Sequence, residues 1–263
     1  MPDYYTTLVP FARLFLSGLP ILMYHKIGRR HRGVKLRSQY IRPGLFRRQM
    51  RELRAANFRT TSPDTVQAME QNTGRSMVIT FDDGYESAFR NALPALTGKG
   101  FKAIQFLVVN HIGGWNEWDT PHGEVSEKLM DDVQIREWLA AGQGIGSHTL
   151  THSSLLALSE SAAREELRAS KRKLEDRFGI RVEHFSYPYG DWNERLRDWV
   201  GEAGYQTACT TSMGVNNQRS HPLSLSRISV RYMSRNFRSV FGMIYGWFRP
   251  GNDLGLLLSQ PVK

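Results

Sequence analysis

The sequence predicts an α/β fold in which parallel strands, arranged as an open sheet or a barrel, alternate with helices. Short apolar segments of strand length alternate along the chain with segments whose apolar residues recur at helical spacing. Polar clusters directly follow several strand segments, and the chemistry of parallel α/β folds collects at the carboxyl ends of strands. The chain has 263 residues, of which 40% are hydrophobic and 23% charged, so it can form a packed core in one large domain or two small ones.

Six segments are predicted strands and four are predicted helices. The strand segments are 20–24, 77–81, 102–109, 144–147, 183–187 and 206–210. The helical segments are 45–53, 87–96, 133–141 and 159–178. The last helix is the clearest, because Ser159 and Ser161 can cap its start, and Glu165 and Glu166 precede basic residues at helical spacing.

Positive charge is concentrated at the two ends of the chain. Residues 1–60 hold 13 basic and 2 acidic residues, residues 61–215 hold 15 and 22, and residues 216–263 hold 7 and 1. A basic segment can bind phosphate in nucleic acid or on anionic lipid headgroups, or it can be a solvated surface. Since no nucleic-acid motif accompanies the charge, we expect no nucleic-acid partner.

The cysteine content and the apolar segments argue against a disulfide-bonded, a membrane-spanning or a secreted protein. Cys209 is the only cysteine, which excludes an intramolecular disulfide and any multi-cysteine metal site. The uncharged run from Leu14 to His25 has 12 residues, whereas a membrane-spanning helix needs about 20. Residues 1–30 also make a poor secretory signal. We therefore expect a cytoplasmic protein.

The predicted strand 77–81 runs directly into Asp82, Asp83 and Gly84. Two adjacent carboxylates repel each other unless positive charge lies nearby, and a divalent metal usually supplies it. Because neighbouring side chains diverge, one carboxylate can bind the metal while the other is free to act as a base. A plain turn is the alternative, since Asp-Asp-Gly is favourable in turns.

His148 and His152 follow the predicted strand 144–147 as an H-x3-H pair. On a helical turn this spacing places both imidazoles on one face. Two imidazoles and one carboxylate form a mononuclear catalytic site with an open coordination position, which suits Zn²⁺, with Co²⁺ or Ni²⁺ as alternatives. Surface histidines are the alternative, but the aspartates at another strand end favour a metal site.

Residues 185–190 are aromatic and contain Pro188 and Gly190. A sharp turn here can direct a backbone N–H into a pocket while Tyr187 and Pro188 form the substrate-binding wall. An ordinary loop with aromatic residues in the core is the alternative. Residues 112–119 form a candidate lid, in which Trp115 and Trp118 either stack on sugar rings or anchor a long loop.

The segments TFDDGY (80–85), SHTLTH (147–152) and FSYPYG (185–190), in this order, resemble the polysaccharide deacetylases of the NodB-homology type, carbohydrate esterase family 4. The resemblance covers roughly residues 20–230. It implies a distorted (β/α)7-type barrel and a metal-dependent N-deacetylase of N-acetylated sugars. By motif position it also implies three roles: Asp82 is the general base, the metal ligands are Asp83, His148 and His152, and the backbone N–H of Tyr189 donates to the oxyanion.

Two departures from the common family pattern point to a rearranged branch that resembles the poly-N-acetylglucosamine deacetylases. No Leu-x-His motif follows residue 190, but Leu22-Met23-Tyr24-His25 resembles the N-terminal motif of that branch. This resemblance implies that His25 is the general acid; a structural histidine is the alternative. Ser186 stands where an arginine commonly holds the base, and Arg227 resembles an arginine of a late motif that would orient Asp82; a surface arginine is the alternative.

The C-terminal region is a candidate membrane contact. Apolar residues recur there on one helical face, namely Phe237, Val240, Phe241, Ile244, Tyr245 and Phe248. Such a helix can lie on an anionic membrane or pack on the barrel. We therefore expect an N-terminal apolar extension at 1–19, a single catalytic domain at 20–232 and a basic amphipathic extension at 233–263.

These expectations combine into one functional prediction. The chain is expected to remove the N-acetyl group from an N-acetylhexosamine in a cell-envelope or lipid-linked glycan, releasing acetate, at a peripheral position on the inner face of the cell membrane. The first alternative is a deacetylase of a small soluble sugar or aminoglycoside-type metabolite. The second is a glycan-binding module without catalysis, against which the intact acidic and histidine residues argue.

Overall fold

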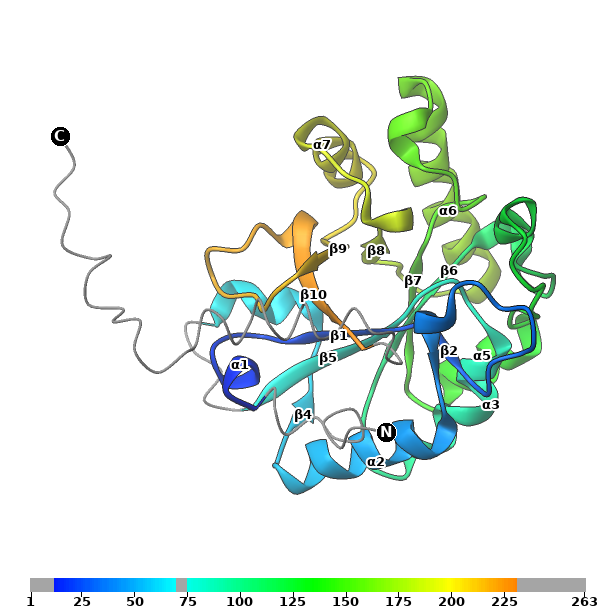
Figure 1. Cartoon of the computed structure of the whole chain (residues 1–263). Helices are drawn as coiled ribbons and strands as arrows, with labels where there is room; N and C mark the ends of the chain where they lie inside the picture. The colour runs from blue at the N-terminus through cyan, green and yellow to red at the C-terminus, as the bar shows by residue number, and fades with distance from the viewer. Residues whose placement is uncertain (1–11, 70–74, 231–263) are drawn as a thin grey trace, which may run out of the picture.

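The computed structural model describes residues 12–69 and 75–230 (Figure 1). Its strands are Ile21–Tyr24 (β1), Lys26–Ile27 (β2), Tyr40–Ile41 (β3), Arg59–Thr60 (β4), Ser76–Phe81 (β5), Ile104–Leu107 (β6), Gly144–Ser147 (β7), His184–Ser186 (β8), Thr207–Met213 (β9) and Leu225–Ser229 (β10). Its α-helices are Ala12–Leu16 (α1), Pro43–Ala55 (α2), Glu86–Asn91 (α3), Leu93–Thr97 (α4), Asp132–Ala140 (α5), Glu160–Phe178 (α6) and Glu194–Glu202 (α7). Two of the short 3-10 helices border the site, Glu117–His122 (η6) and Pro188–Gly190 (η8).

Seven parallel strands close into a barrel, which confirms the predicted fold class. The hydrogen-bonded order is β1-β10-β9-β8-β7-β6-β5, and β1 also pairs with β5, so the sheet returns on itself. The closing pair places Ile21 opposite Val78 and Tyr24 opposite Phe81. β4 joins the sheet beside the first residues of β5. Because the strands of the ring run in one direction, their carboxyl ends lie at one end of the barrel, where the site forms.

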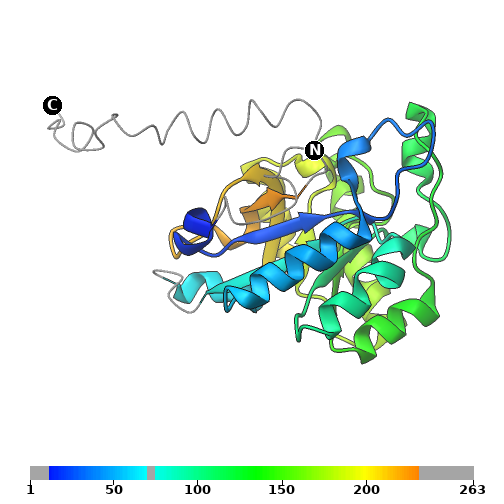
Figure 2. The ribbon, with the colours of Figure 1, turned by 60° about the horizontal axis from the view of Figure 1, so that its bottom comes forward.

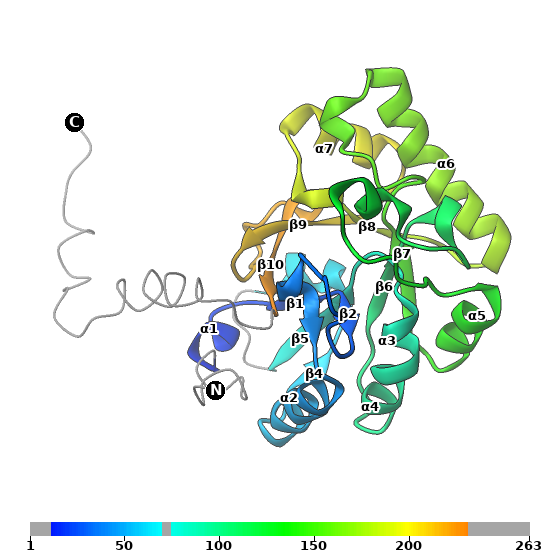
Figure 3. The same cartoon turned by 45° about the vertical axis from the view of Figure 1, so that its right-hand side comes forward.

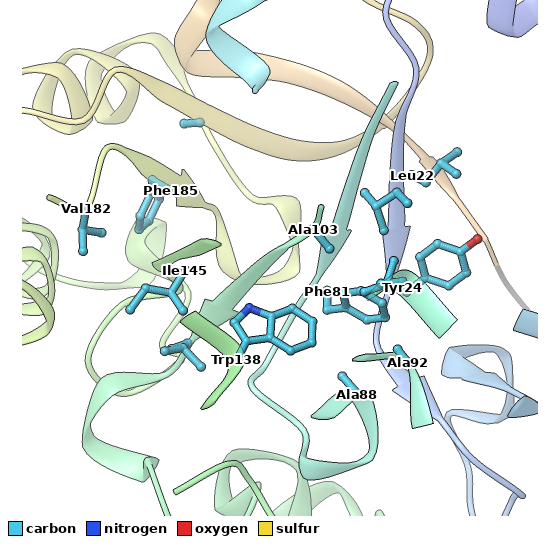
Figure 4. Close-up of a cluster of buried hydrophobic side chains, with 14 of the residues drawn as sticks. Leu22, Tyr24, Phe81, Ala88, Ala92, Ala103, Trp138, Ile145, Val182 and Phe185 are labelled. Atoms are coloured by element: carbon cyan, nitrogen blue, oxygen red, sulfur yellow. The ribbon is translucent and has the colours of Figure 1, made fainter. Parts of the chain in front are cut away.

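Helices surround the strands, and the main hydrophobic core lies between the two layers (Figures 1 and 3). α2 runs alongside β1 (Figure 2) and buries Phe46, Met50 and Leu53, which recur at helical spacing. The ring of Tyr24 stacks on Phe81 at 5.5 Å, within the cluster shown in Figure 4. The outward-facing residues of the strands are therefore packed tightly, which fixes the strand ends that carry the site.

The inside of the barrel changes from apolar to polar along its axis. At one level Ile21, Val78, Cys209 and Leu225 belong to a second buried cluster that also includes Leu19, Val66, Ile104 and Phe106. Towards the carboxyl ends of the strands the buried side chains are polar and include Thr80, Ser186 and Arg227. Buried polar groups must be hydrogen-bonded, so this level is the foundation on which the site residues are held.

The structure agrees with some of the expected elements and differs from others. The predicted helix 87–96 is two helices, α3 and α4, which meet at Ala92, because Pro94 cannot donate the backbone hydrogen bond that a continuous helix needs. The short strands β2, β3 and β4 have too few residues to show a periodic pattern. The predicted helix 159–178 matches α6, and the Ser159 hydroxyl accepts from the Ala162 amide at 3.3 Å as its cap.

Parts of the predicted terminal extensions lie outside the described residues. These include the apolar helical face at 237–248 and the first 11 residues. Within the predicted N-terminal extension, Phe15 of α1 is buried against Phe58 at 5.8 Å. In the part of the chain that the structure describes, no helix combines the length and the apolarity needed to cross a bilayer.

Candidate metal centre and active site

Asp83, His148 and His152 come together at the carboxyl end of the barrel. One ligand atom from each lies within 4.8 Å of the others, and all three residues are buried. The Oδ1 atom of Asp83 is 3.3 Å from Nε2 of His148 and 3.3 Å from Nε2 of His152. Ligand atoms at the usual distances from a tetrahedral zinc are separated by roughly 3.3–3.5 Å. The donor set and its spacing therefore fit a metal such as Zn²⁺.

The two imidazole rings are oriented by different contacts. Nδ1 of His148 lies 2.7 Å from the carbonyl oxygen of Ser186, so Nδ1–H donates there and Nε2 keeps a free lone pair for a metal. The ring of His152 lies between two aromatic side chains, stacked on Trp118 at 4.7 Å and edge-to-face with Tyr189 at 4.8 Å. Both rings therefore present Nε2 towards the carboxylate of Asp83.

The loop that carries the histidines is not a helical turn, so that expectation was wrong. No helix or strand covers residues 148–152, and Thr149 and His152 have positive φ angles of 70° and 62°. A carboxylate from α6 holds this loop: Glu166 accepts hydrogen bonds from the amides of Leu150 and Thr151, at 2.7 and 3.2 Å, and from the Thr151 hydroxyl at 2.8 Å. Sequence reasoning missed Glu166, because it reads as one of many acidic residues on a helix.

Arg227 holds the second carboxylate, that of Asp82. Its two terminal nitrogens donate to Oδ1 and Oδ2 of Asp82, both at 2.7 Å. The remaining donors reach the carbonyl of Thr210 at 2.8 Å, the hydroxyl of Ser186 at 3.0 Å and the hydroxyl of Thr80 at 3.3 Å. All five N–H groups of a guanidinium are thereby used. Asp82 is thus fixed by a fully satisfied buried partner.

The surroundings of the two carboxylates keep them ionised. Burial alone would raise the pKa of Asp82, but the charge and hydrogen bonds of Arg227, together with the nearby His148, lower that pKa below its ordinary value. Burial would also raise the pKa of Asp83, but hydrogen bonds to His148 and His152 hold it well below the ordinary range. Both side chains are therefore carboxylates at neutral pH, one available to a metal and one to a proton.

His25 also lies close to Asp82. Its Nε2 is 4.0 Å from Oδ2 of Asp82, and its side chain is 17% exposed. Burial lowers the pKa of His25 below its ordinary value, and the negative charges of Asp83 and Asp82 oppose that shift. The imidazole is near the base without being hydrogen-bonded to it, so both groups can contact the same reacting group from one side.

The residue after His25 is anchored firmly, which fixes the direction of the imidazole. The side chain of Lys26 is fully buried, and its Nζ lies 4.9 Å from the ring centre of Tyr40 and 4.5 Å from that of Tyr85. The carboxylate of Glu127 is 3.6 Å from the same nitrogen. His25 therefore projects from a short connection held by β1 on one side and by this buried lysine on the other.

A cavity of about 410 Å³ joins these groups, and it is of a size that holds a small ligand. His25, Asp82, Trp118 and Tyr189 line it. Asp119, at the end of the candidate lid 112–119, also lines it. Further lining residues come from regions that the sequence analysis did not connect with the site: Lys35, Leu36, Gln39, His122 and Glu124. No local pattern marks these residues, because loops far apart in the chain bring them together.

The predicted substrate-binding residues have different positions. Trp118 borders the cavity, whereas Trp115, which is 48% exposed, is not among the residues that line it. Tyr187 lies at the cavity, but its ring is buried against Phe185 and its hydroxyl donates to the carbonyl of Leu223 at 2.8 Å. Pro188 is buried at the start of η8. Of these four, Trp118 is the side chain best placed to meet a substrate.

The turn that presents Tyr189 depends on glycine. Tyr189 has φ 61° and ψ −5° inside η8, and its side chain is 50% exposed. The next residue, Gly190, has φ 78°, and a Cβ at that position would lie 2.0 Å from the hydroxyl oxygen of Thr211. Since no side chain fits there, Gly190 is required for the tight turn that positions the Tyr189 backbone at the mouth of the cavity.

The polysaccharide deacetylase family model matches residues 69–208. The chain belongs to the polysaccharide deacetylase family. The Bacillus subtilis protein YxkH, whose name also refers to polysaccharide deacetylation, is 29% identical over 218 residues, which are 81% of this chain and 72% of that protein. The poly-beta-1,6-N-acetyl-D-glucosamine N-deacetylase of Staphylococcus epidermidis is 29% identical over 124 residues, which are 46% of this chain and 42% of that enzyme. This chain therefore matches less than half of the length of the staphylococcal enzyme.

Solved structures agree on the fold. The deacetylase PplD of Streptococcus pyogenes superimposes with a TM-score of 0.69 and 23% identity, over 81% of this chain and 92% of that one. IcaB of Ammonifex degensii gives a TM-score of 0.69 and 21% identity, over 85% and 95% of the two chains. His25 and Arg227 lie outside the residues that the family model matches. Their place beside Asp82 comes from the geometry of the barrel.

Proposed function

We propose that this deacetylase removes N-acetyl groups from N-acetylhexosamine units of a glycan, with a bound divalent metal, and releases acetate. The observation that carries the proposal is that the two adjacent carboxylates, Asp82 and Asp83, have different partners. Asp83 completes a three-residue ligand set, whereas Asp82 is held by Arg227 and lies 4.0 Å from an imidazole. A hydrolase of this kind needs a metal site, a base and an acid around one cavity.

The residues of the site have distinct tasks in this proposal. Asp83, His148 and His152 would hold the metal, which when bound polarises the acetyl carbonyl and lowers the pKa of water. The Asp82 carboxylate accepts the proton of the attacking water, and Arg227 keeps it ionised and oriented. His25 donates a proton to the departing amine. The backbone N–H of Tyr189 donates to the oxygen that becomes negatively charged.

An assay of acetate release tests this proposal. The full chain is incubated with a neutral N-acetylglucosamine tetrasaccharide, with and without a chelator, and acetate and free amine are quantified. We expect equal amounts of acetate and amine without the chelator, and loss of both with it. A protein that binds the tetrasaccharide but releases no acetate would contradict the proposal and would instead be a glycan-binding module.

We also propose that the enzyme works in the cytoplasm at the inner face of the cell membrane, on a lipid-linked or nascent envelope glycan. The basic ends of the chain and the single buried Cys209 support this proposal. Sedimentation with anionic and neutral vesicles tests it, using the full chain and a truncation after Tyr232. Equal, negligible pelleting of both proteins with anionic vesicles at low salt would contradict membrane binding and favour the alternative, a small soluble N-acetylated sugar.

A further inference from the structure

A basic groove lies beside the catalytic cavity and takes no part in the chemistry described above. It has a volume of about 1160 Å³ and is bordered by residues 28–34, by Arg37 and Tyr40, and by the start of α2. Seven arginines line it, and we call it the arginine groove: Arg29, Arg30, Arg32, Arg37, Arg42, Arg47 and Arg48. Among the described residues that line the groove there is no aspartate or glutamate.

This concentration of positive charge indicates an anionic ligand. All seven arginines are exposed, and local contacts occupy some of their donors, as between Arg48 and Glu52 at 3.0 Å and between Arg37 and the carbonyl of Val34 at 3.3 Å. Like charges gathered in one concave surface repel each other, and an anion bound among them removes that repulsion. The planar guanidinium matches phosphate oxygens in pairs, so phosphate is the anion this lining suits best.

The N-terminus of α2 adds to the positive electrostatic potential of the arginine groove. The helix has 13 residues, begins at Pro43 and has no acidic residue in its first turn and no side chain that caps it. The N-terminus of a helix carries partial positive charge, which favours a phosphate nearby. Pro43 has no N–H, and the amides of Leu45 and Phe46 both donate to the carbonyl of Arg42, so α2 contributes through its dipole. This contribution supports the arginines and would not define a site alone.

The arginine groove and the catalytic cavity share one wall. Within residues 34–40, Val34, Arg37 and Tyr40 line the groove, whereas Lys35, Leu36 and Gln39 line the cavity. Because neighbouring residues of one short segment face the two spaces, a ligand of several sugar units can extend from one into the other.

This shared wall is held in place by the loop that contains η6. The carboxylate of Glu124 accepts the amides of Lys35 and Leu36 at 2.9 and 2.6 Å, and Nζ of Lys35 donates to the carbonyl of His122 at 2.7 Å. The wall is therefore a fixed part of the site, and the two spaces keep a defined relationship.

The character of the groove favours a substrate phosphate over a membrane or a nucleic acid. Surfaces that insert into a membrane expose apolar side chains, whereas in this lining Val34 and Tyr40 are buried and Leu45 is half-buried. Single-stranded nucleic acid needs exposed aromatic rings for stacking, and Tyr40 is 2% exposed. A concave, arginine-rich space suits one or two phosphate groups on a flexible chain.

We propose that the arginine groove binds a phosphate or diphosphate carried by the same glycan whose N-acetyl group enters the catalytic cavity. This inference rests on the proposed deacetylase function and names its substrate class, an anionic glycan such as one linked to a carrier through phosphate. The groove then selects phosphate-bearing chains and places them across the shared wall, while the cavity performs the hydrolysis.

Two matched triple variants of the full, metal-loaded chain test the proposal. The groove variant is Arg29→Gln, Arg32→Gln and Arg47→Gln. The control variant removes the same charge from exposed arginines elsewhere, Arg172→Gln, Arg181→Gln and Arg219→Gln. Each is assayed for acetate release from a neutral N-acetylglucosamine tetrasaccharide and from the same tetrasaccharide 1-phosphate. Calorimetry in an Asp82→Asn background measures the affinities without consuming substrate.

The wild type and the control variant should have a KM at least tenfold lower for the phosphorylated tetrasaccharide than for the neutral one. The groove variant should lose this preference while its kcat on the neutral tetrasaccharide stays within twofold of wild type. An equal KM for both substrates in the wild type, or an unchanged preference in the groove variant, would overturn the proposal.

Two further outcomes separate the alternatives. If the groove variant loses only its sedimentation with phosphatidylglycerol vesicles, the groove belongs to a membrane surface and the proposal is wrong. If neither tetrasaccharide releases acetate in the wild type, the proposed deacetylase function fails. Calorimetry then still reports whether the groove binds phosphate, so the two failures are distinguishable.

Discussion

Arg227 donates to both carboxylate oxygens of Asp82 at 2.7 Å, across 145 positions of sequence. Arg227 lies on β10 and Asp82 follows β5, and β1 is the strand between them in the ring. The guanidinium is fully buried, and its other donors reach three groups from β5, β8 and β9. One side chain therefore connects four strands at the level where the site begins. It serves the stability of the barrel as well as the orientation of the base.

Removal of one member of the Asp82–Arg227 ion pair should strongly destabilise the folded protein. Arg227→Ala leaves a buried carboxylate without its partner, and we expect the free energy of unfolding to fall by about 3–5 kcal/mol. Chemical denaturation of the two single variants and of the Asp82→Ala, Arg227→Ala double variant measures this. The double variant should be more stable than Arg227→Ala alone, because no unpaired charge remains. A loss below about 1 kcal/mol for Arg227→Ala would show that the pair contributes little.

The same pair should make stability depend on pH. The pKa of Asp82 is lowered in the folded protein, so the unfolded chain takes up this proton first as the pH falls. The stabilisation is fully present above the unfolded carboxyl pKa of about 4 and is lost as the pH falls through the folded value. Between about pH 5 and pH 3 the unfolding free energy of the chelated wild type should fall more steeply than that of Asp82→Asn. Parallel slopes in urea titrations would contradict this.

His25 should matter for turnover and not for metal binding. His25→Ala is expected to fold and keep its metal, because the imidazole lies outside the ligand set, and to lose about 10²–10⁴ in kcat. Acetate release and metal content, measured on the same preparation, check both parts. Near wild-type activity would exclude His25 as the acid, and loss of metal would make it a ligand.

The metal ligands can be tested against a matched histidine. His148→Ala should greatly reduce bound zinc. His184→Ala should retain it, because His184 contacts Thr207 at 2.9 Å and lies outside the ligand set. Elemental analysis after dialysis against a metal buffer gives the comparison. One tight equivalent of zinc in His148→Ala would show that the ligand set is wrong.

Glu166 should support the metal from a distance. Because it binds the amides of Leu150 and Thr151 between the two histidines, Glu166→Ala should weaken zinc affinity by about 10–100-fold. The neighbouring Glu165, whose side chain is 65% exposed, supplies the control, and Glu165→Ala should leave the affinity unchanged. Competition with a chromophoric chelator measures both. Equal affinities in the two variants would remove Glu166 from this role.

The sequence was sufficient for the fold class and for the segments that meet at the site. Strands 77–81 and 144–147 could be predicted because each is a short uncharged segment that ends at a cluster of polar residues, and the three motifs lie at the ends of β5, β7 and β8. The structure brings Arg227 to Asp82 as the resemblance implied, while the catalytic roles remain predictions. Local sequence could not show the conformation of residues 148–152, since their positive φ angles depend on Glu166 from a distant helix.

The part of the cavity wall that Lys35 and Leu36 form could not be predicted, for a related reason. Lys35 and Leu36 are held by Glu124 through backbone amides, 89 and 88 positions apart. Because the donors are the backbone amides of Lys35 and Leu36, these contacts do not depend on the side chains at those positions. Periodicity and motif spacing therefore cannot predict them. For Tyr187 the sequence motif predicted a ring that forms the substrate-binding wall. In the structure the ring is buried and its hydroxyl donates to the carbonyl of Leu223.

A metal titration of activity tests the central claim most directly. Chelated, metal-free protein is titrated with Zn²⁺ while acetate release from the N-acetylglucosamine tetrasaccharide and bound zinc are measured together. We predict that activity rises in proportion to bound zinc and reaches its plateau at one equivalent, and that Asp83→Ala gains neither. Full activity in the metal-free protein, or restored activity in Asp83→Ala, would contradict the account.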